Sequence, residues 1–117
     1  MALQLVEKQI DGVSVLDFAG RITLGDEKEQ VGKKIKEMLG KGKSQIVLNL
    51  EGVSYIDSAG LGALVWGRTS AQNQGATLKL ANPNKTFRAL LNITKLVTIF
   101  DIYESVDDAV KSFAKKA

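Results

Sequence analysis

Near the middle of the chain lies the hexapeptide QIVLNL, residues 45–50, a short apolar run in which branched side chains predominate. Such a run predicts a strand buried on both faces, in a sheet that helices cover on each side. A chain of 117 residues can build one hydrophobic core without a disulfide or a structural metal. We therefore place residues 45–50 centrally in a sheet and expect residues 1–117 to form a single domain.

Upstream of this strand, the sequence predicts a hairpin and a helix. Residues 3–20 contain two apolar runs separated by Asp11-Gly12, a pair that favours a tight hairpin turn. The spacing Asp26-x-x-Glu29 matches a helix capping box, and apolar residues then recur at helical spacing up to Gly40. We expect the first strand to be an antiparallel edge of the sheet.

Downstream, a turn is expected at residues 51–52, followed by a helix that opens at residues 57–65 and ends near Gly75. Residues 77–80 predict the next strand. Asn82-Pro83 predicts the start of a third helix, because Asn is a favoured cap and Pro fits the first turn.

The third helix is expected to end at Asn92, and residues 97–102 predict the last strand. Ser105-x-x-Asp108 then caps a terminal helix. The predicted order is β-β-α-β-α-β-α-β-α, an α/β fold with about four helices. Right-handed crossovers make the strands after the hairpin mutually parallel.

Composition narrows the function. The sequence contains no Cys and no His, which removes thiol nucleophiles, the usual histidine base and the commonest zinc ligands. The net charge of +3 is small for a nucleic-acid-binding protein. We see neither a secretory signal nor an apolar run that could span a bilayer, so we expect a cytoplasmic protein without membrane insertion.

One stretch is not explained by local structure alone, namely VSYIDSAGLG at residues 53–62. Its two glycines fall in the opening turns of a helix, where each costs roughly 1 kcal/mol relative to Ala. Small residues around Ser58 leave its hydroxyl and the nearby backbone open to close approach by another molecule. The pattern therefore predicts a docking surface.

DSAGLG at residues 57–62, preceded by the buried strand, resembles the signature of STAS domains in bacterial anti-sigma factor antagonists. Gly20-Arg21-Ile22-Thr23 at the end of the second strand and Phe87-x-x-Leu90-Leu91 in the third helix support the resemblance, which covers about residues 5–113.

This resemblance implies partner switching. The unphosphorylated protein binds an anti-sigma factor serine kinase and so releases a sigma factor, until the kinase phosphorylates Ser58. A serine phosphatase of the metal-dependent class reverses the modification. The chain is then a substrate and a ligand, not an enzyme, and needs no cofactor. Where the family often has a second Ser, this sequence has Ala59, so Ser58 is the sole candidate in the motif.

Elementary electrostatics agrees with such a switch. A phosphoserine adds about −1.5 to −2 charge where a small neutral group stood. Like charges about 4 Å apart repel by roughly 1 kcal/mol in water and about 4 kcal/mol at an effective dielectric constant near 20. Each 1.4 kcal/mol is about a tenfold change in affinity, so binding is lost without any refolding.

The expected docking rim surrounds Ser58 on two loops. Asp57 is expected to orient the hydroxyl or to set how well the kinase accepts this serine. The complete set of expected partner-binding residues is Arg21, Thr23, Gly25, Asp26, Tyr55, Asp57, Ala59, Gly60, Leu61 and Gly62.

Several alternatives stay open at this stage. Ser58 could be only a helix N-cap. A STAS-like domain could also be an accessory subunit of a membrane transporter or a scaffold component of a stress-signalling assembly. A weak homodimer through the first strand is open as well, because unprotected edges often pair. Weak nucleotide binding is undecided, although Gly42-Lys43-Ser44 lacks the full phosphate-loop pattern. A serine hydrolase is disfavoured by the absence of His.

Overall fold

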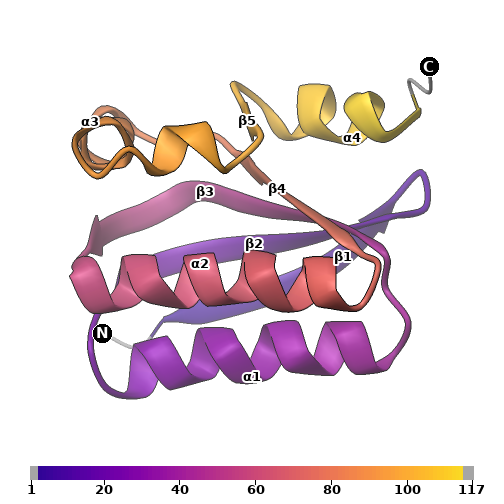
Figure 1. Cartoon of the computed structure of the whole chain (residues 1–117), viewed down its shortest axis with the longest axis horizontal. Coiled ribbons are helices and arrows are strands. Elements are labelled where there is room, and N and C mark those ends of the chain that lie inside the picture. Colours follow the sequence, from indigo (N-terminus) through magenta and orange to yellow (C-terminus); the bar gives the residue numbers. More distant parts are fainter. Residues whose placement is uncertain (1–2, 115–117) are drawn as a thin grey trace.

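The computed structural model describes residues 3–114 (Figure 1). Its elements in chain order are β1 (Gln4–Ile10), β2 (Val13–Ile22), α1 (Asp26–Gly40), β3 (Gln45–Ile56), α2 (Ser58–Asn73), β4 (Thr77–Ala81), α3 (Lys85–Ile93), the 3₁₀ helix η1 (Leu96–Thr98), β5 (Ile102–Tyr103) and α4 (Val106–Ala114).

The sheet has the order β1-β2-β3-β4-β5, in which β1 is antiparallel to β2 and each later pair is parallel. The predicted fold class and the central position of residues 45–50 are confirmed. Asp11 and Gly12 both have positive φ in the hairpin turn, as predicted. Helices α1 and α2 cover one face of the sheet (Figure 1), and α3 adds Phe87 and Leu91 to the same side, whereas α4 packs on the opposite face.

Two clusters of apolar side chains hold these layers together. The larger lies between the sheet and helices α1, α2 and α3, and includes the fully buried Ile22, Ile35 and Leu64. The smaller lies on the opposite face, where Val47 packs beneath Val110 of α4. Alternation of side chains along each strand sends apolar residues into both clusters, which explains why the central strand reads as a continuous apolar run.

A buried lysine fastens α4 to the sheet. Lys79 of β4 donates a hydrogen bond from Nζ to Ser112 Oγ at 2.7 Å, and its ammonium lies 4.1 Å from the ring centre of Phe113. Cation–π contact and hydrogen bonding together satisfy a charge that is otherwise costly to bury. The predicted cap of this helix is confirmed, because Asp108 N donates to Ser105 Oγ at 3.0 Å.

The turn predicted at residues 51–52 is wrong, because β3 continues to Ile56 and stays paired with β2. The register shifts between Asp17 and Ala19, and Gly52 faces Ala19. A Cβ at residue 52 would lie 2.3 Å from Phe18 O, so glycine permits close approach of the two strands.

Two helix starts also differ from the prediction. The capping box is wrong, since Asp26 is already helical and the N-cap, Gly25, provides no side-chain hydrogen bond. The third helix is capped by Asn84, whose side chain accepts from Phe87 N, and not by Asn82. Asn82 instead has a φ of 59° at the end of β4. This helix ends at Ile93, one residue beyond Asn92.

The last strand is much shorter than predicted. Residues 96–98 form a 3₁₀ helix, and only Ile102 and Tyr103 pair with β4. Lys95 has a φ of 63° and turns the chain after α3. In the described range, 3–114, no helix has the length and apolarity needed to cross a membrane.

Candidate functional site

The motif around Ser58 lies where β2 and β3 end side by side. Both strands run in the same direction, and Ile22 pairs with Ile56 at their carboxyl ends. Asp57 N donates a hydrogen bond to Ile22 O at 3.3 Å, so the start of α2 is held against the end of β2. The loop before α1 and the first turn of α2 therefore form one surface.

Asp57 joins these two segments through both carboxylate oxygens. Oδ1 accepts from Gly60 N at 2.8 Å, which makes Asp57 the N-cap of α2, and Oδ2 accepts from Leu24 N at 3.1 Å. These hydrogen bonds, that from Gly60 first, lower the pKa of Asp57 below its ordinary value because they favour the charged carboxylate. Asp57 is therefore ionised at neutral pH.

Ser58 is the first residue of α2 and is exposed. The interpretation of Ser58 as the helix N-cap is wrong, because Asp57 occupies that position. The carboxylate of Asp57 is directed to backbone N–H groups of Gly60 and Leu24, so its structural role differs from the expected orientation of the Ser58 hydroxyl. Ser58 is left at the surface for another molecule to approach.

The two glycines of the motif differ in whether the fold requires a residue without a side chain. A Cβ at Gly60 would lie 2.1 Å from Ile22 O, so this glycine allows α2 to pack against β2. A Cβ at Gly62 would meet nothing within 4 Å. Leu61 is 5% exposed and belongs to the core. The prediction that Gly60 and Leu61 line the rim is therefore corrected, since both support it from beneath.

Arg21 and Tyr55 form the second part of the expected rim. They face each other in the register of β2 and β3, and the Arg21 guanidinium lies 5.3 Å from the ring centre of Tyr55. Tyr55 is 52% exposed. Exposed cation–π pairs are worth about 0.5–1 kcal/mol, which is enough to orient both side chains at this edge.

The remaining rim residues lie in the loop between β2 and α1. Gly25 and Asp26 are exposed, and Thr23 Oγ1 donates to Glu27 Oε1 at 2.6 Å. Sequence reasoning missed Leu24, whose side chain is 72% exposed although Asp57 holds its backbone. A lone leucine in a loop gives a weak signal, and only the contact with Asp57 places it beside Ser58.

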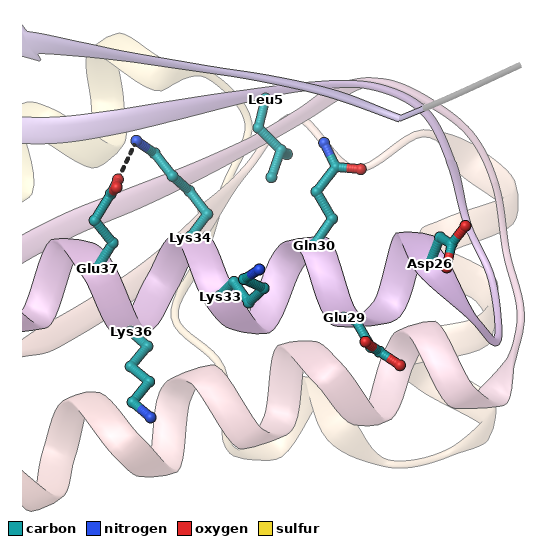
Figure 2. A pocket seen from close by; sticks show the side chains of 8 residues that line it. All are labelled: Leu5, Asp26, Glu29, Gln30, Lys33, Lys34, Lys36 and Glu37. Carbon is teal, nitrogen blue, oxygen red and sulfur yellow. Dashed lines mark hydrogen bonds and ion pairs between the residues drawn. The ribbon is translucent and has the colours of Figure 1, made fainter.

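A groove of about 810 Å³ lies between β1 and α1 and extends from Asp26 to Glu37 (Figure 2). Leu5 faces a row of charged α1 side chains there. Lys34 Nζ lies 2.7 Å from Glu37 Oε1 and 3.1 Å from Glu7 Oε1. Hydrogen bonding to Glu37 and then to Glu7 raises the pKa of Lys34. The ammonium group of Lys34 is thus paired with two carboxylates inside the groove.

The sequence also matches a known family. Residues 4–109 match the STAS domain. This chain belongs to the STAS domain family. The predicted resemblance is therefore confirmed over most of the chain.

This STAS domain has relatives in sequence and in structure. A candidate anti-sigma factor antagonist of Thermotoga maritima is 34% identical over 80 residues, which are 68% of this chain and 71% of that protein. The anti-sigma-B factor antagonist of Bacillus subtilis is 39% identical over 62 residues, 53% of this chain and 57% of that protein. A crystal structure of a candidate antagonist from T. maritima superposes with a TM-score of 0.88 at 28% identity, covering 95% of each chain.

The relatives place this STAS domain among anti-sigma factor antagonists, which are in general regulatory proteins and not enzymes. That placement agrees with a site consisting of an exposed hydroxyl and a capped helix.

Proposed function

We propose that this STAS domain is an anti-sigma factor antagonist whose partner is an anti-sigma factor serine kinase. The unphosphorylated form binds the kinase and releases a sigma factor for transcription. Phosphorylation of Ser58 abolishes that binding, and a metal-dependent serine phosphatase restores it. The observation that carries the proposal is the exposed Ser58 on a first helical turn whose backbone Asp57 holds in place.

The charge of Asp57 beside Ser58 explains why a phosphate on Ser58 would disturb the binding of the partner. The capping hydrogen bond of Asp57 already occupies Gly60 N. A phosphate on Ser58 would sit beside an ionised carboxylate, so like-charge repulsion directs it away from Asp57 and outward. An interface fitted to a neutral hydroxyl then has to accommodate about −1.5 to −2 charge.

This role also accounts for the rest of the molecule. The chain itself supplies a substrate hydroxyl and a docking surface, so we expect no catalytic activity and no cofactor of its own. A partner kinase and a sigma factor act in the cytoplasm, and we propose the same location for this domain. Direct contact with nucleic acid is not required, because the sigma factor carries that function.

The test is intact mass after incubation with ATP and serine kinases of the source cell. We expect a single added phosphate in the wild type and in Ser54→Ala, and none in Ser58→Ala. Ser54 is a matched control, since it is exposed and lies four residues earlier in β3. Phosphate at another residue, or none with any kinase, would contradict the proposal.

Binding to the same kinase separates this function from the alternatives. Ser58→Ala should stay bound in the presence of ATP, whereas Ser58→Asp should bind at least tenfold more weakly. A transporter subunit or a scaffold component would treat both variants alike. Such a result would favour those roles over partner switching.

A further inference from the structure

The outward face of α2 carries no charge. Its exposed residues are Ser58, Gly62, Trp66, Thr69, Gln72 and Asn73. Arg68 is half-buried and donates to Gln72 Oε1 at 3.2 Å. The neighbouring helix differs sharply, because its exposed residues include Asp26, Lys28, Glu29, Lys33, Lys36 and Glu37 (Figure 2). Protein interfaces are depleted of charged residues at their centre and enriched in Trp.

Gly62 lies on this face without a reason in the fold. A Cβ at Gly67 would lie 2.7 Å from Ile35 Cδ1, and one at Gly60 would meet the backbone of β2, so both glycines serve internal packing. At Gly62 the space is open, and glycine in a helix is unfavourable relative to alanine. The missing side chain leaves backbone bare toward the outside.

Trp66 follows one turn later on the same stripe, since residues 58, 62 and 66 are four apart. It is the single tryptophan of the chain and is 45% exposed. A Cβ at Gly32 of α1 would lie 3.9 Å from its Cζ3, so one edge of the indole rests on α1. The rest of the ring is presented at the surface.

A protein partner that binds over Ser58 also covers this face of α2, because a standard protein interface is large enough to include it. One side of a standard protein interface buries about 800 Å², which corresponds to a disc of roughly 16 Å radius. A rise of 1.5 Å per residue puts Gly62 about 6 Å and Trp66 about 12 Å along the helix from Ser58. Both residues therefore fall within the footprint of a protein centred on the switch.

We propose that the uncharged face of α2, defined by Ser58, Gly62 and Trp66, is the docking surface for the kinase, with Trp66 as its anchor. The kinase packs backbone or small side chains over Gly62 and encloses the indole in an uncharged, apolar pocket. Trp66 lies about 12 Å along the helix from Ser58, farther than the Debye length of about 8 Å. The charge of a phosphate on Ser58 therefore acts at one end of the face, while Trp66 contributes affinity at the other. This inference rests on the proposed function, whose kinase is the occupant.

The first test is calorimetric titration of the purified kinase that phosphorylates Ser58 into the full chain. Trp66→Ala should bind at least about tenfold more weakly, as expected for a central aromatic anchor. Ile93→Ala is the matched control, because Ile93 is 78% exposed and is the last residue of α3, outside the uncharged face of α2. It should bind like the wild type.

The second test uses Gly62→Ala, which separates folding from binding. The variant should melt at a higher temperature, because alanine favours the helix and finds open space. It should nevertheless bind the kinase at least about fivefold more weakly, since the added methyl group obstructs close approach. Gly40→Ala, at the end of α1 and equally unobstructed, should leave binding unchanged.

Two kinds of failure can be told apart. A kinase that phosphorylates Ser58 and binds Trp66→Ala and Gly62→Ala as tightly as the wild type overturns the docking assignment and leaves the proposed function standing. Absence of any kinase that binds or phosphorylates the chain overturns the proposed function and this inference with it.

Discussion

The backbone N–H of Leu24 donates a hydrogen bond to Oδ2 of Asp57 at 3.1 Å, across 33 residues of sequence. The other carboxylate oxygen caps α2 through Gly60 N. One side chain therefore sets the position of the loop before α1 relative to the helix that carries Ser58. Substitutions at Asp57 should separate its two hydrogen bonds.

We expect Asp57→Ala to lower the urea midpoint of unfolding more than Asp57→Asn. Alanine removes both acceptors, whereas the Asn side-chain oxygen can still cap Gly60 N, as Asn is a good N-cap. The Asn amide group would face the Leu24 N–H, so that contact is lost in both variants. Equal midpoints for wild type and Asp57→Ala would show that the two contacts stabilise nothing.

The lowered pKa of Asp57 predicts a pH dependence. Its ordinary value is 3.8, and the folded value lies below it because Gly60 N and Leu24 N bind the charged form. A group with a depressed folded pKa stabilises the protein above its unfolded pKa, and this contribution is lost as the pH falls through the folded pKa. Wild type should therefore exceed Asp57→Asn in stability at pH 7, with the difference shrinking below about pH 4.

Salt should distinguish this effect from that of an ion pair. Glu37 also has a lowered pKa, caused first by its hydrogen bond with Lys34 and then by the charge of that lysine. Exposed ion pairs are screened, whereas hydrogen bonds from backbone N–H groups carry no net charge. The Asp57 effect should persist at high salt and that of Glu37→Gln should fade. Loss of both to the same extent would contradict this assignment.

Gly60→Ala should be far more damaging than its place in a surface motif indicates. Its Cβ would meet Ile22 O at 2.1 Å and Ile22 C at 2.8 Å, and backbone cannot rotate out of the way. We expect a loss of about 3 kcal/mol or more in the free energy of unfolding, or failure to fold. Urea unfolding checks this against Gly62→Ala, which should be at least as stable as the wild type. A mild loss would mean that α2 shifts easily from β2.

The sequence predicted the architecture because its signals are periodic and local. A nearly continuous run of branched apolar side chains marked the central strand, and Asp11-Gly12 marked the hairpin. The strand predicted at residues 97–102 was wrong because Ile99 and Phe100 reach the core from the segment after a 3₁₀ helix, without pairing as a strand. Apolar character alone does not distinguish the two.

The candidate site was predictable in position but not in detail. The motif placed Ser58 at the start of a helix, but the sequence left open whether Ser58 is itself the N-cap, because Ser and Asp are both favoured there. The roles of Gly60 and Gly62 differ only through the backbone of β2, which lies far away in sequence. Leu24 likewise depends on a tertiary contact with Asp57.

Phosphorylation of Ser58 should leave the fold unchanged. The hydroxyl is exposed, and Asp57 rather than Ser58 caps α2, so a phosphate replaces no internal contact of the cap. Chain carrying phosphoserine at position 58 should show amide hydrogen exchange like that of the unmodified chain in β3, β4 and α4. Changes should be confined to the first turn of α2 and the Leu24 loop that Asp57 attaches to it. Altered protection in the central strands would instead indicate a switch that works by repacking, in which charge at the surface plays the smaller part.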